Sequence, residues 1–270
     1  KKLYNEENLE KLYLKSTDYI QQKDRLVLGN LNDTETDLHI AFYKKIKGDN
    51  DFKKLYCKFV KEIHEYFFPE EEYLIYQTFP SIRIQFPESI TIPPHKDSDG
   101  LSNHPLGEKN FLIPITPMIN TNSIIIESEC DKKDFKSISL KYGDLFYFNG
   151  NTCTHYNDKN IENKTRISLD FRVMLKKNYL NYLNTNNLKR TNPRDVSKAR
   201  EPTKMLIGGY YKICKKNLSL DKMINWYKNT NFIMQHRPTF GKDEADEVYK
   251  YMLEDSFLTE HKKIFLCFSL

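Results

Sequence analysis

The sequence predicts a mainly β protein with helices on either side of the sheet region. Three observations support this fold class. Before residue 70, apolar residues recur at helix-like offsets, as in the runs 8–14 and 52–60. Between about 73 and 175, short apolar runs of strand length are separated by Pro, Gly and Asn turn signals. After Lys176 the sequence becomes rich in Asn and Lys and loses its periodicity.

These three regions define the expected organisation of the chain. Helices that precede a β core commonly cover one of its sheets, because an apolar sheet face must be buried. Helical patterning returns after the linker, from Asp221. We therefore expect a helical N-terminal buttress at residues 1–70, a β core at 71–180, and a linker with a helical C-terminal extension at 181–270.

The composition of the chain indicates which binding partners and which cellular compartment to expect. The net charge of +5 is small for 270 residues and the Lys residues are scattered, so we expect no nucleic-acid surface. No apolar run approaches the length of a membrane-spanning helix, so we expect no membrane partner. The five Cys are widely spaced and odd in number, which favours reduced thiols and a cytoplasmic location.

Two histidines and one aspartate in the β region have the spacing of a metal site. His95 and Asp97 point to the same side of a strand, because side-chain direction alternates with a period of two. His155 lies far enough along the chain to come from a separate strand. Two imidazoles and one carboxylate form the facial triad of non-haem Fe(II) oxygenases. The alternative is that the histidines are ordinary surface or core residues and that Asp97 and Asp99 cap a turn.

Arg166 follows His155 by 11 positions (166 minus 155), within an alternating strand pattern. A cation at this offset suits the distal carboxylate of 2-oxoglutarate, which an Arg side chain can grip with two parallel hydrogen bonds. The alternative is that Arg166 lies at a rim and pairs with Asp158 or Glu162.

The region from Pro94 to Val173, about a third of the chain, resembles a family. The pieces that carry the resemblance occur in the family's order: HKDSD, HPLGEKNFLIPIT, TNSIIIESE, YGDLFYFNG, THYN and TRISLDFRV. The family is that of Fe(II)/2-oxoglutarate-dependent oxygenases related to a streptomycin-biosynthesis protein and to aminoglycoside-pathway dioxygenases. The resemblance implies a double-stranded β-helix core, of the jelly-roll or cupin-like kind, with iron on His95, Asp97 and His155. It also implies that Arg166, helped by Ser168, holds 2-oxoglutarate.

Four further residues are candidates for contacts in this site. Arg83 and Gln85 share one face of an alternating strand; if that face lines the core, they contact cosubstrate or substrate, and otherwise they face solvent. Asn110 leads a buried strand, and its amide either orients 2-oxoglutarate or satisfies a turn. His104 lies in a polar loop after the His-x-Asp motif, where it either contacts substrate or is a plain loop histidine.

A second, shorter resemblance lies at residues 236–263, HRPTFGKDEADEVYKYMLEDSFLTEHKK. This segment resembles the opening of the sugar aminotransferases of the DegT/DnrJ/EryC type. The body of such an enzyme cannot fit in the seven residues that follow (270 minus 263). We therefore expect a sugar-pathway context, or a truncated fusion with a sugar aminotransferase, and no transaminase activity; a plain amphipathic helix is the alternative.

Together these observations predict an Fe(II)/2-oxoglutarate-dependent dioxygenase. We expect Fe(II), 2-oxoglutarate and O2 as cofactor and cosubstrates. The expected substrate is a small molecule, a sugar, an amino sugar or a nucleotide-linked sugar, which is hydroxylated or otherwise oxidised with release of succinate and CO2. Two alternatives remain: a peptidyl or amino-acid hydroxylase on the same metal site, and a non-catalytic jelly-roll binding module.

Overall fold

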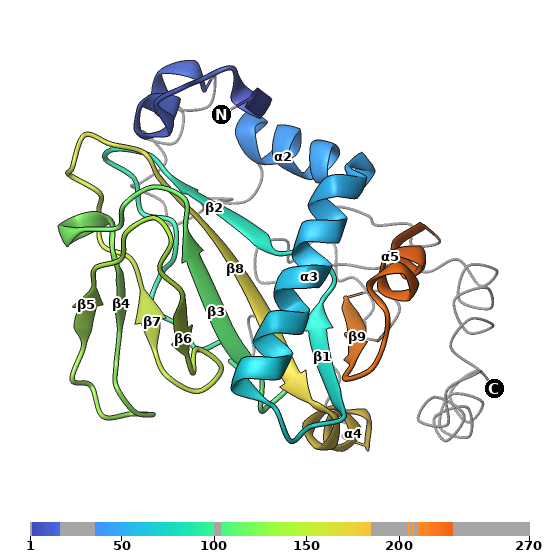
Figure 1. Cartoon of the computed structure of the whole chain (residues 1–270). Helices are drawn as coiled ribbons and strands as arrows, with labels where there is room; N and C mark the ends of the chain where they lie inside the picture. Colours follow the sequence, from blue (N-terminus) through green and yellow to red (C-terminus); the bar gives the residue numbers. More distant parts are fainter. Residues whose placement is uncertain are drawn as a thin grey trace, which may run out of the picture.

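A computed structural model of the chain describes residues 2–16, 36–99, 104–184, 205, 207 and 210–228, and the side chains of 225–228 are not described. Helices flank two β-sheets in this part of the chain (Figure 1). The helices are η1 (Lys2–Tyr4), η2 (Leu9–Lys15), α2 (Asp37–Gly48), α3 (Asn50–Phe67), η4 (Asn120–Asn122), α4 (Lys176–Asn184) and α5 (Leu220–Lys228). The strands are β1 (Tyr73–Gln77), β2 (Ser81–Gln85), β3 (Lys109–Pro114), β4 (Ile124–Ile126), β5 (Lys136–Ile138), β6 (Phe146–Phe148), β7 (His155–Tyr156), β8 (Arg166–Leu175) and β9 (Tyr211–Lys215).

The two long N-terminal helices begin at side-chain caps. Thr36 accepts a hydrogen bond from the backbone N–H of His39 at the start of α2, and Asp49 accepts one from Phe52 at the start of α3. On α3 the buried side chains recur every three or four residues, which gives the helix one apolar face. That face packs on the large sheet, together with part of α2.

All strand pairs of the two sheets are antiparallel. The large sheet has the order β6-β3-β8-β1-β9, with β2 also paired to β8, and the small sheet has the order β5-β4-β7. The expected fold class, mainly β with flanking helices, is therefore confirmed. Strand β9 was not predicted, because its register with β1 joins segments more than 130 residues apart. It lies within the segment expected to be linker and helix.

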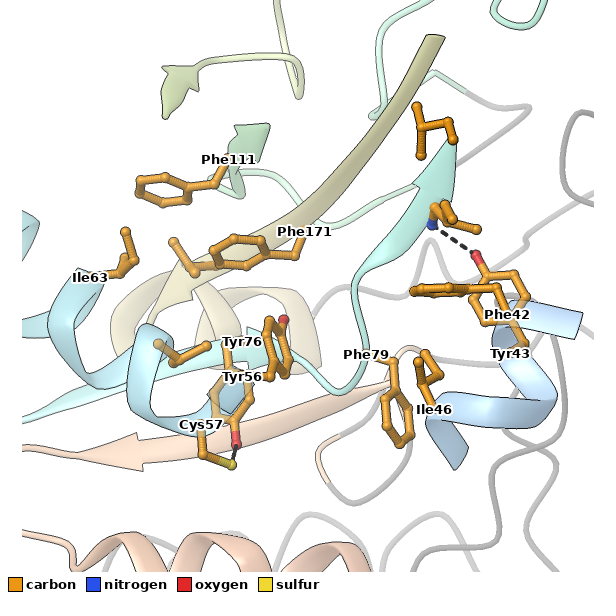
Figure 2. Packing of buried hydrophobic residues seen from close by; sticks show 14 of the residues in the cluster. Phe42, Tyr43, Ile46, Tyr56, Cys57, Ile63, Tyr76, Phe79, Phe111 and Phe171 are labelled. Carbon is orange, nitrogen blue, oxygen red and sulfur yellow. Dashed lines mark hydrogen bonds between the residues drawn. The ribbon is translucent and has the colours of Figure 1, made fainter. Parts of the chain in front are cut away.

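Strand β8 divides the large sheet into an apolar and a polar face. Its residues Ile167, Phe171 and Val173 are buried in the core beneath the helices, where Phe171 stacks on Phe111 at 5.3 Å between ring centroids. Figure 2 shows these two rings beside α3. The alternate residues of β8 point to the opposite face, because strand side chains alternate. The side chains on that face are those of Arg166, Ser168, Asp170 and Arg172.

The aromatic packing at Phe171 gives a prediction for stability. Phe171 is fully buried and also meets Tyr56 edge-on at 5.6 Å. Replacing it by Ala leaves a cavity, so Phe171→Ala should lower the free energy of unfolding by about 3–5 kcal/mol in urea denaturation. Leu55 lies on the exposed side of α3, and Leu55→Ala should change it by less than about 0.5 kcal/mol. Equal losses in the two variants would contradict this packing.

Candidate metal centre

His95, Asp97 and His155 come together at one point, between the two sheets. The backbones of His95 and His155 exchange two hydrogen bonds, at 3.2 and 3.0 Å, and their ring centroids are 4.4 Å apart. Asp97 is held beside them because its N–H donates to the carbonyl of Gly150 at 3.0 Å. One nitrogen or oxygen from each of the three side chains lies within 4.8 Å of the others.

Backbone carbonyls orient both imidazole rings. The Nδ1 atom of His95 lies 2.8 Å from the carbonyl oxygen of Pro93, and that of His155 lies 3.1 Å from the carbonyl oxygen of Cys153. A carbonyl can only accept, so each Nδ1 carries a proton, and Nε2 is the nitrogen whose lone pair a metal can use. Burial lowers the pKa of His155 to about 4, with a smaller contribution from His95. His155 is therefore neutral at pH 7, the form in which imidazole binds metals.

The Asp97 carboxylate is almost completely buried and is fixed by two side chains. Asn110 Nδ2 donates to its Oδ2 at 2.7 Å, and Arg172 donates from Nε to Oδ2 at 2.9 Å and from Nη2 to Oδ1 at 3.1 Å. Burial by itself would raise the pKa of Asp97, but the positive charge of the Arg172 guanidinium holds it well below its usual range. Asp97 is therefore ionised at neutral pH.

These residues fit a divalent transition metal. Two imidazole nitrogens and one carboxylate oxygen are the donors of a facial triad, and every donor side chain is oriented by a hydrogen bond behind it. Asn110 Oδ1 is buried without a hydrogen-bond partner, as expected of an acceptor beside a site that a bound group completes. Among the residues that the structure describes, this is the only group of His, Cys, Asp and Glu with such geometry.

Arg166 is buried and lies close to this centre. Its Nη2 donates to Asn157 Oδ1 at 2.8 Å and to Thr91 Oγ1 at 3.3 Å, and its Nη1 donates to Ser168 Oγ at 2.9 Å. Asn157 lies two residues after His155, a step of about 6.6 Å along an extended chain. The burial of Arg166 argues against the alternative of a rim residue paired across the surface.

The other predicted residues lie on the same polar face of the large sheet. Gln85 is fully buried and accepts hydrogen bonds from Arg166, at 3.2 Å from Nη2 and 3.4 Å from Nε. Arg83 donates from Nε to Asp170 Oδ1 at 2.9 Å. The face that carries Arg83 and Gln85 thus lines the interior rather than the solvent. Asn110 contacts Asp97, as described above.

His104 belongs to a buried network that the sequence analysis did not predict. Its Nδ1 lies 2.8 Å from Glu108 Oε2, and its backbone N–H donates to the carbonyl of Asp97 at 2.9 Å. Glu108 is fully buried and also accepts a hydrogen bond from the hydroxyl of Tyr211 on β9. Burial lowers the pKa of His104, with Arg172 contributing in the same direction.

Arg172, Asp170 and Glu108 are the charged residues near the site that sequence reasoning missed. A signal for two of them was present, since from Arg166 onward every second residue of the strand is polar, and the polar set ends at Arg172. Such alternation predicts a polar interior face but does not say which carboxylate an arginine contacts. No comparable signal marked Glu108, which contacts His104 within its own loop and Tyr211 from a segment 103 residues away.

One curated protein resembles this chain in sequence. It is the streptomycin biosynthesis protein StrG of Streptomyces griseus, 25% identical over 118 residues. The match covers 43% of this chain and 55% of StrG, so the chain spans about half the length of this relative. The match agrees with the resemblance carried by the motifs between Pro94 and Val173. No protein-family model matches the chain.

Remote likenesses to solved structures also occur. The epimerase SnoN in complex with Fe3+, alpha ketoglutarate and nogalamycin RO is 11% identical, with a TM-score of 0.38, over 73% of this chain and 88% of SnoN. The nickel complex of the non-heme monooxygenase ThoJ is 9% identical, with a TM-score of 0.31, over 72% of this chain and 66% of ThoJ. At these TM-scores the structural likeness is slight.

Two expectations concern other parts of the chain. The aminotransferase-like segment 236–263 lies outside the described residues, and neither that resemblance nor a fusion receives support from the proteins above. Every helix in the described residues is too short or too polar to span a membrane.

Gly150 gives a prediction for the packing of the centre. A Cβ atom at this position would lie 2.7 Å from Phe148 Cε2, 3.0 Å from His155 Cε1 and 3.1 Å from Asn110 Cγ. Gly150→Ala should therefore lower the free energy of unfolding by about 1–3 kcal/mol, measured by thermal or urea denaturation. Gly48→Ala is the control, since a Cβ there meets nothing within 4 Å, and its stability should be unchanged or slightly raised. A stable Gly150→Ala protein would contradict the close packing around His155.

Proposed function

We propose that this chain is an Fe(II)/2-oxoglutarate-dependent dioxygenase. The observation that carries the proposal is the group of His95, Asp97 and His155, with its ligand atoms within 4.8 Å of one another and the Nδ1 atom of each imidazole hydrogen-bonded to a carbonyl. A two-histidine, one-carboxylate set leaves the opposite coordination positions open to other ligands. The arginine expected for 2-oxoglutarate is buried and bonded to Asn157, two residues from His155.

The architecture supports a double-stranded β-helix core. Two antiparallel sheets are present, and the centre takes His155 from β7 of the small sheet and the residues behind Asp97 from β3 and β8 of the large sheet. A jelly-roll of this kind places a site between its sheets. The expected division at residues 70 and 180 remains a prediction.

Each residue has a distinct task in this proposal. His95, Asp97 and His155 would hold Fe(II), while Arg166 and Ser168 would bind the distal carboxylate of 2-oxoglutarate. When bound, Fe(II) and 2-oxoglutarate supply the activation of O2 and the oxidation of the substrate, with release of succinate and CO2. The protein keeps the His155 imidazole neutral, keeps the Asp97 carboxylate ionised and excludes water from the buried face of the large sheet.

For the substrate we propose a sugar, an amino sugar or a nucleotide-linked sugar. Support comes from the resemblance to StrG, a protein whose name places it in streptomycin biosynthesis. A screen of succinate release with sugars, amino sugars and nucleotide-linked sugars tests this choice. Amino acids and peptides form the comparison set, and turnover with them alone would make the chain an amino-acid or peptidyl hydroxylase. Metal binding with no turnover on any class would indicate a binding module.

Removal of a ligand tests the metal site. Wild-type protein should bind one Fe(II) or Co(II) per chain, and His95→Ala or His155→Ala should reduce the affinity at least 100-fold, because two ligands hold the ion far less firmly than three. Isothermal titration with Co(II) under anaerobic conditions measures this. His64→Gln is a matched control, a buried histidine that bonds the carbonyl of Glu71 and lies outside the group, and it should bind normally. Normal affinity in either alanine variant would refute the site.

Replacement of Arg166 tests the cosubstrate site. A charge-assisted, two-pronged contact in a buried pocket is worth about 2–4 kcal/mol when one partner is truncated. Arg166→Ala should therefore weaken 2-oxoglutarate binding by about 30- to 1,000-fold. Arg166→Lys should recover part of the loss, since lysine restores the positive charge but not the two parallel hydrogen-bond donors of the guanidinium. Titration of 2-oxoglutarate into the anaerobic Fe(II) protein, followed by its charge-transfer absorption, gives the affinity.

The metal affinity of the Arg166 variants serves as the internal control. Arg166 is not a metal ligand, so Co(II) should bind both variants as it binds the wild type. An unchanged 2-oxoglutarate midpoint in Arg166→Ala would place the anchor elsewhere, with Arg83 the next cation on the same face.

A further inference from the structure

The two oxygens of Asp97 are not equivalent. Oδ2 accepts hydrogen bonds from both Asn110 Nδ2 and Arg172 Nε, at 2.7 and 2.9 Å. Oδ1 accepts one, from Arg172 Nη2 at 3.1 Å, and it lies 3.5 Å from His95 Nε2. A carboxylate oxygen offers about two lone-pair directions. The lone pairs of Oδ2 are therefore both used, whereas Oδ1 keeps one that is directed to the histidine side.

Arg172 is itself held in place on the polar face of the sheet. Its Nη1 donates to Gln77 Oε1 and to Asp170 Oδ2, both at 3.4 Å. Its Nε lies 3.8 Å from Glu108 Oε2, and only 4% of the side chain is exposed. A guanidinium with a rigid fork and partners on several sides cannot swing away when a ligand approaches Asp97.

Three carboxylates, Asp97, Glu108 and Asp170, lie around Arg172 in the described part of the chain. Asp170 also pairs with Arg83 at 2.9 Å, and Glu108 also contacts His104 at 2.8 Å. Asp97 is the carboxylate that Arg172 contacts through two nitrogens, Nε and Nη2. Buried charges are costly unless they are paired, so movement of Arg172 away from this cluster is disfavoured.

From this geometry we propose that Arg172 is a positioning residue for the metal. It fixes Asp97 so that only Oδ1 can coordinate, and it prevents the carboxylate from turning to bind through both oxygens. The inference rests on the metal site of the proposed function and adds a residue and a coordination mode to it. A carboxylate that occupies one position leaves more positions open for cosubstrate and O2 than a chelating one would.

The test compares Arg172→Lys with Arg83→Lys. Both substitutions keep the positive charge and remove the planar guanidinium, and both positions lie on the same face of the sheet. Both arginines contact Asp170, but only Arg172 contacts Asp97. Co(II) is titrated into the metal-free proteins at fixed pH with a competing chelator, without 2-oxoglutarate. Loss of a partner behind a metal ligand typically costs about 10- to 100-fold in affinity. We expect that loss and altered Co(II) d–d absorption for Arg172→Lys, and an unchanged affinity and spectrum for Arg83→Lys.

A second variant covers the case in which Arg172→Lys does not fold, as judged by thermal unfolding of the metal-free protein. Asn110→Ala frees one lone pair of Oδ2, so it should also alter the d–d absorption of bound Co(II) and weaken its binding. Wild-type affinity and spectrum in the folded Arg172 or Asn110 variant would overturn the positioning role while leaving the metal site intact. Failure of the wild type to bind Co(II), or normal binding by His95→Ala, would overturn both proposals.

Discussion

The organisation of the molecule depends on the alternation of side chains along β8. This strand pairs with β3 on one edge and with β2 and β1 on the other, and the side chains on both of its faces are largely buried. Ile167 and Phe171 point to the helices and join the apolar core, whereas Arg166 and Arg172 point to the opposite side. If the two faces of β8 were exchanged, the charged side chains would be buried without partners against the aromatic rings of the core. The register of β8 is thereby fixed, and with it the position of every polar side chain around the metal centre.

The buried ion cluster on that face is better explained by the orientation that it gives to Asp97 than by the stability that it adds to the fold. A buried pair can often be replaced by apolar residues at little cost, but removing one partner costs about 3–5 kcal/mol because a charge is stranded. The pair of Arg172 and Asp97 thus contributes little net stability relative to an apolar core. What the pair does provide is a carboxylate held at a defined angle, with one oxygen directed toward His95. Such fixation matters where a ligand must meet a metal in a narrow range of geometry.

The residues of the candidate metal centre could be predicted because their information is local or periodic. His95 and Asp97 share a strand face by spacing alone, and the position of Arg166 relative to His155 follows from one strand pattern. The contacts behind these residues could not be predicted, because Arg172 reaches Asp97 across 75 positions of sequence. The same limit applies to β9, whose apolar pattern is short and whose partner β1 is far away in the chain. Burial of His104 was missed because its polar loop context resembled an exposed segment.

Residues of β9, which follow the three candidate ligands in the sequence, also contact the surroundings of the centre. Tyr211 pairs with Gln77 between β9 and β1, and Gln77 accepts a hydrogen bond from Arg172. Tyr211 also donates to Glu108, which lies beside the same guanidinium. Strand β9 therefore contacts the cluster behind Asp97 at two points. Its loss would expose the edge of β1 and leave Glu108 without one of its donors. The segment around residue 211 thus contacts the surroundings of Arg172, although none of its residues belongs to the candidate metal-binding group.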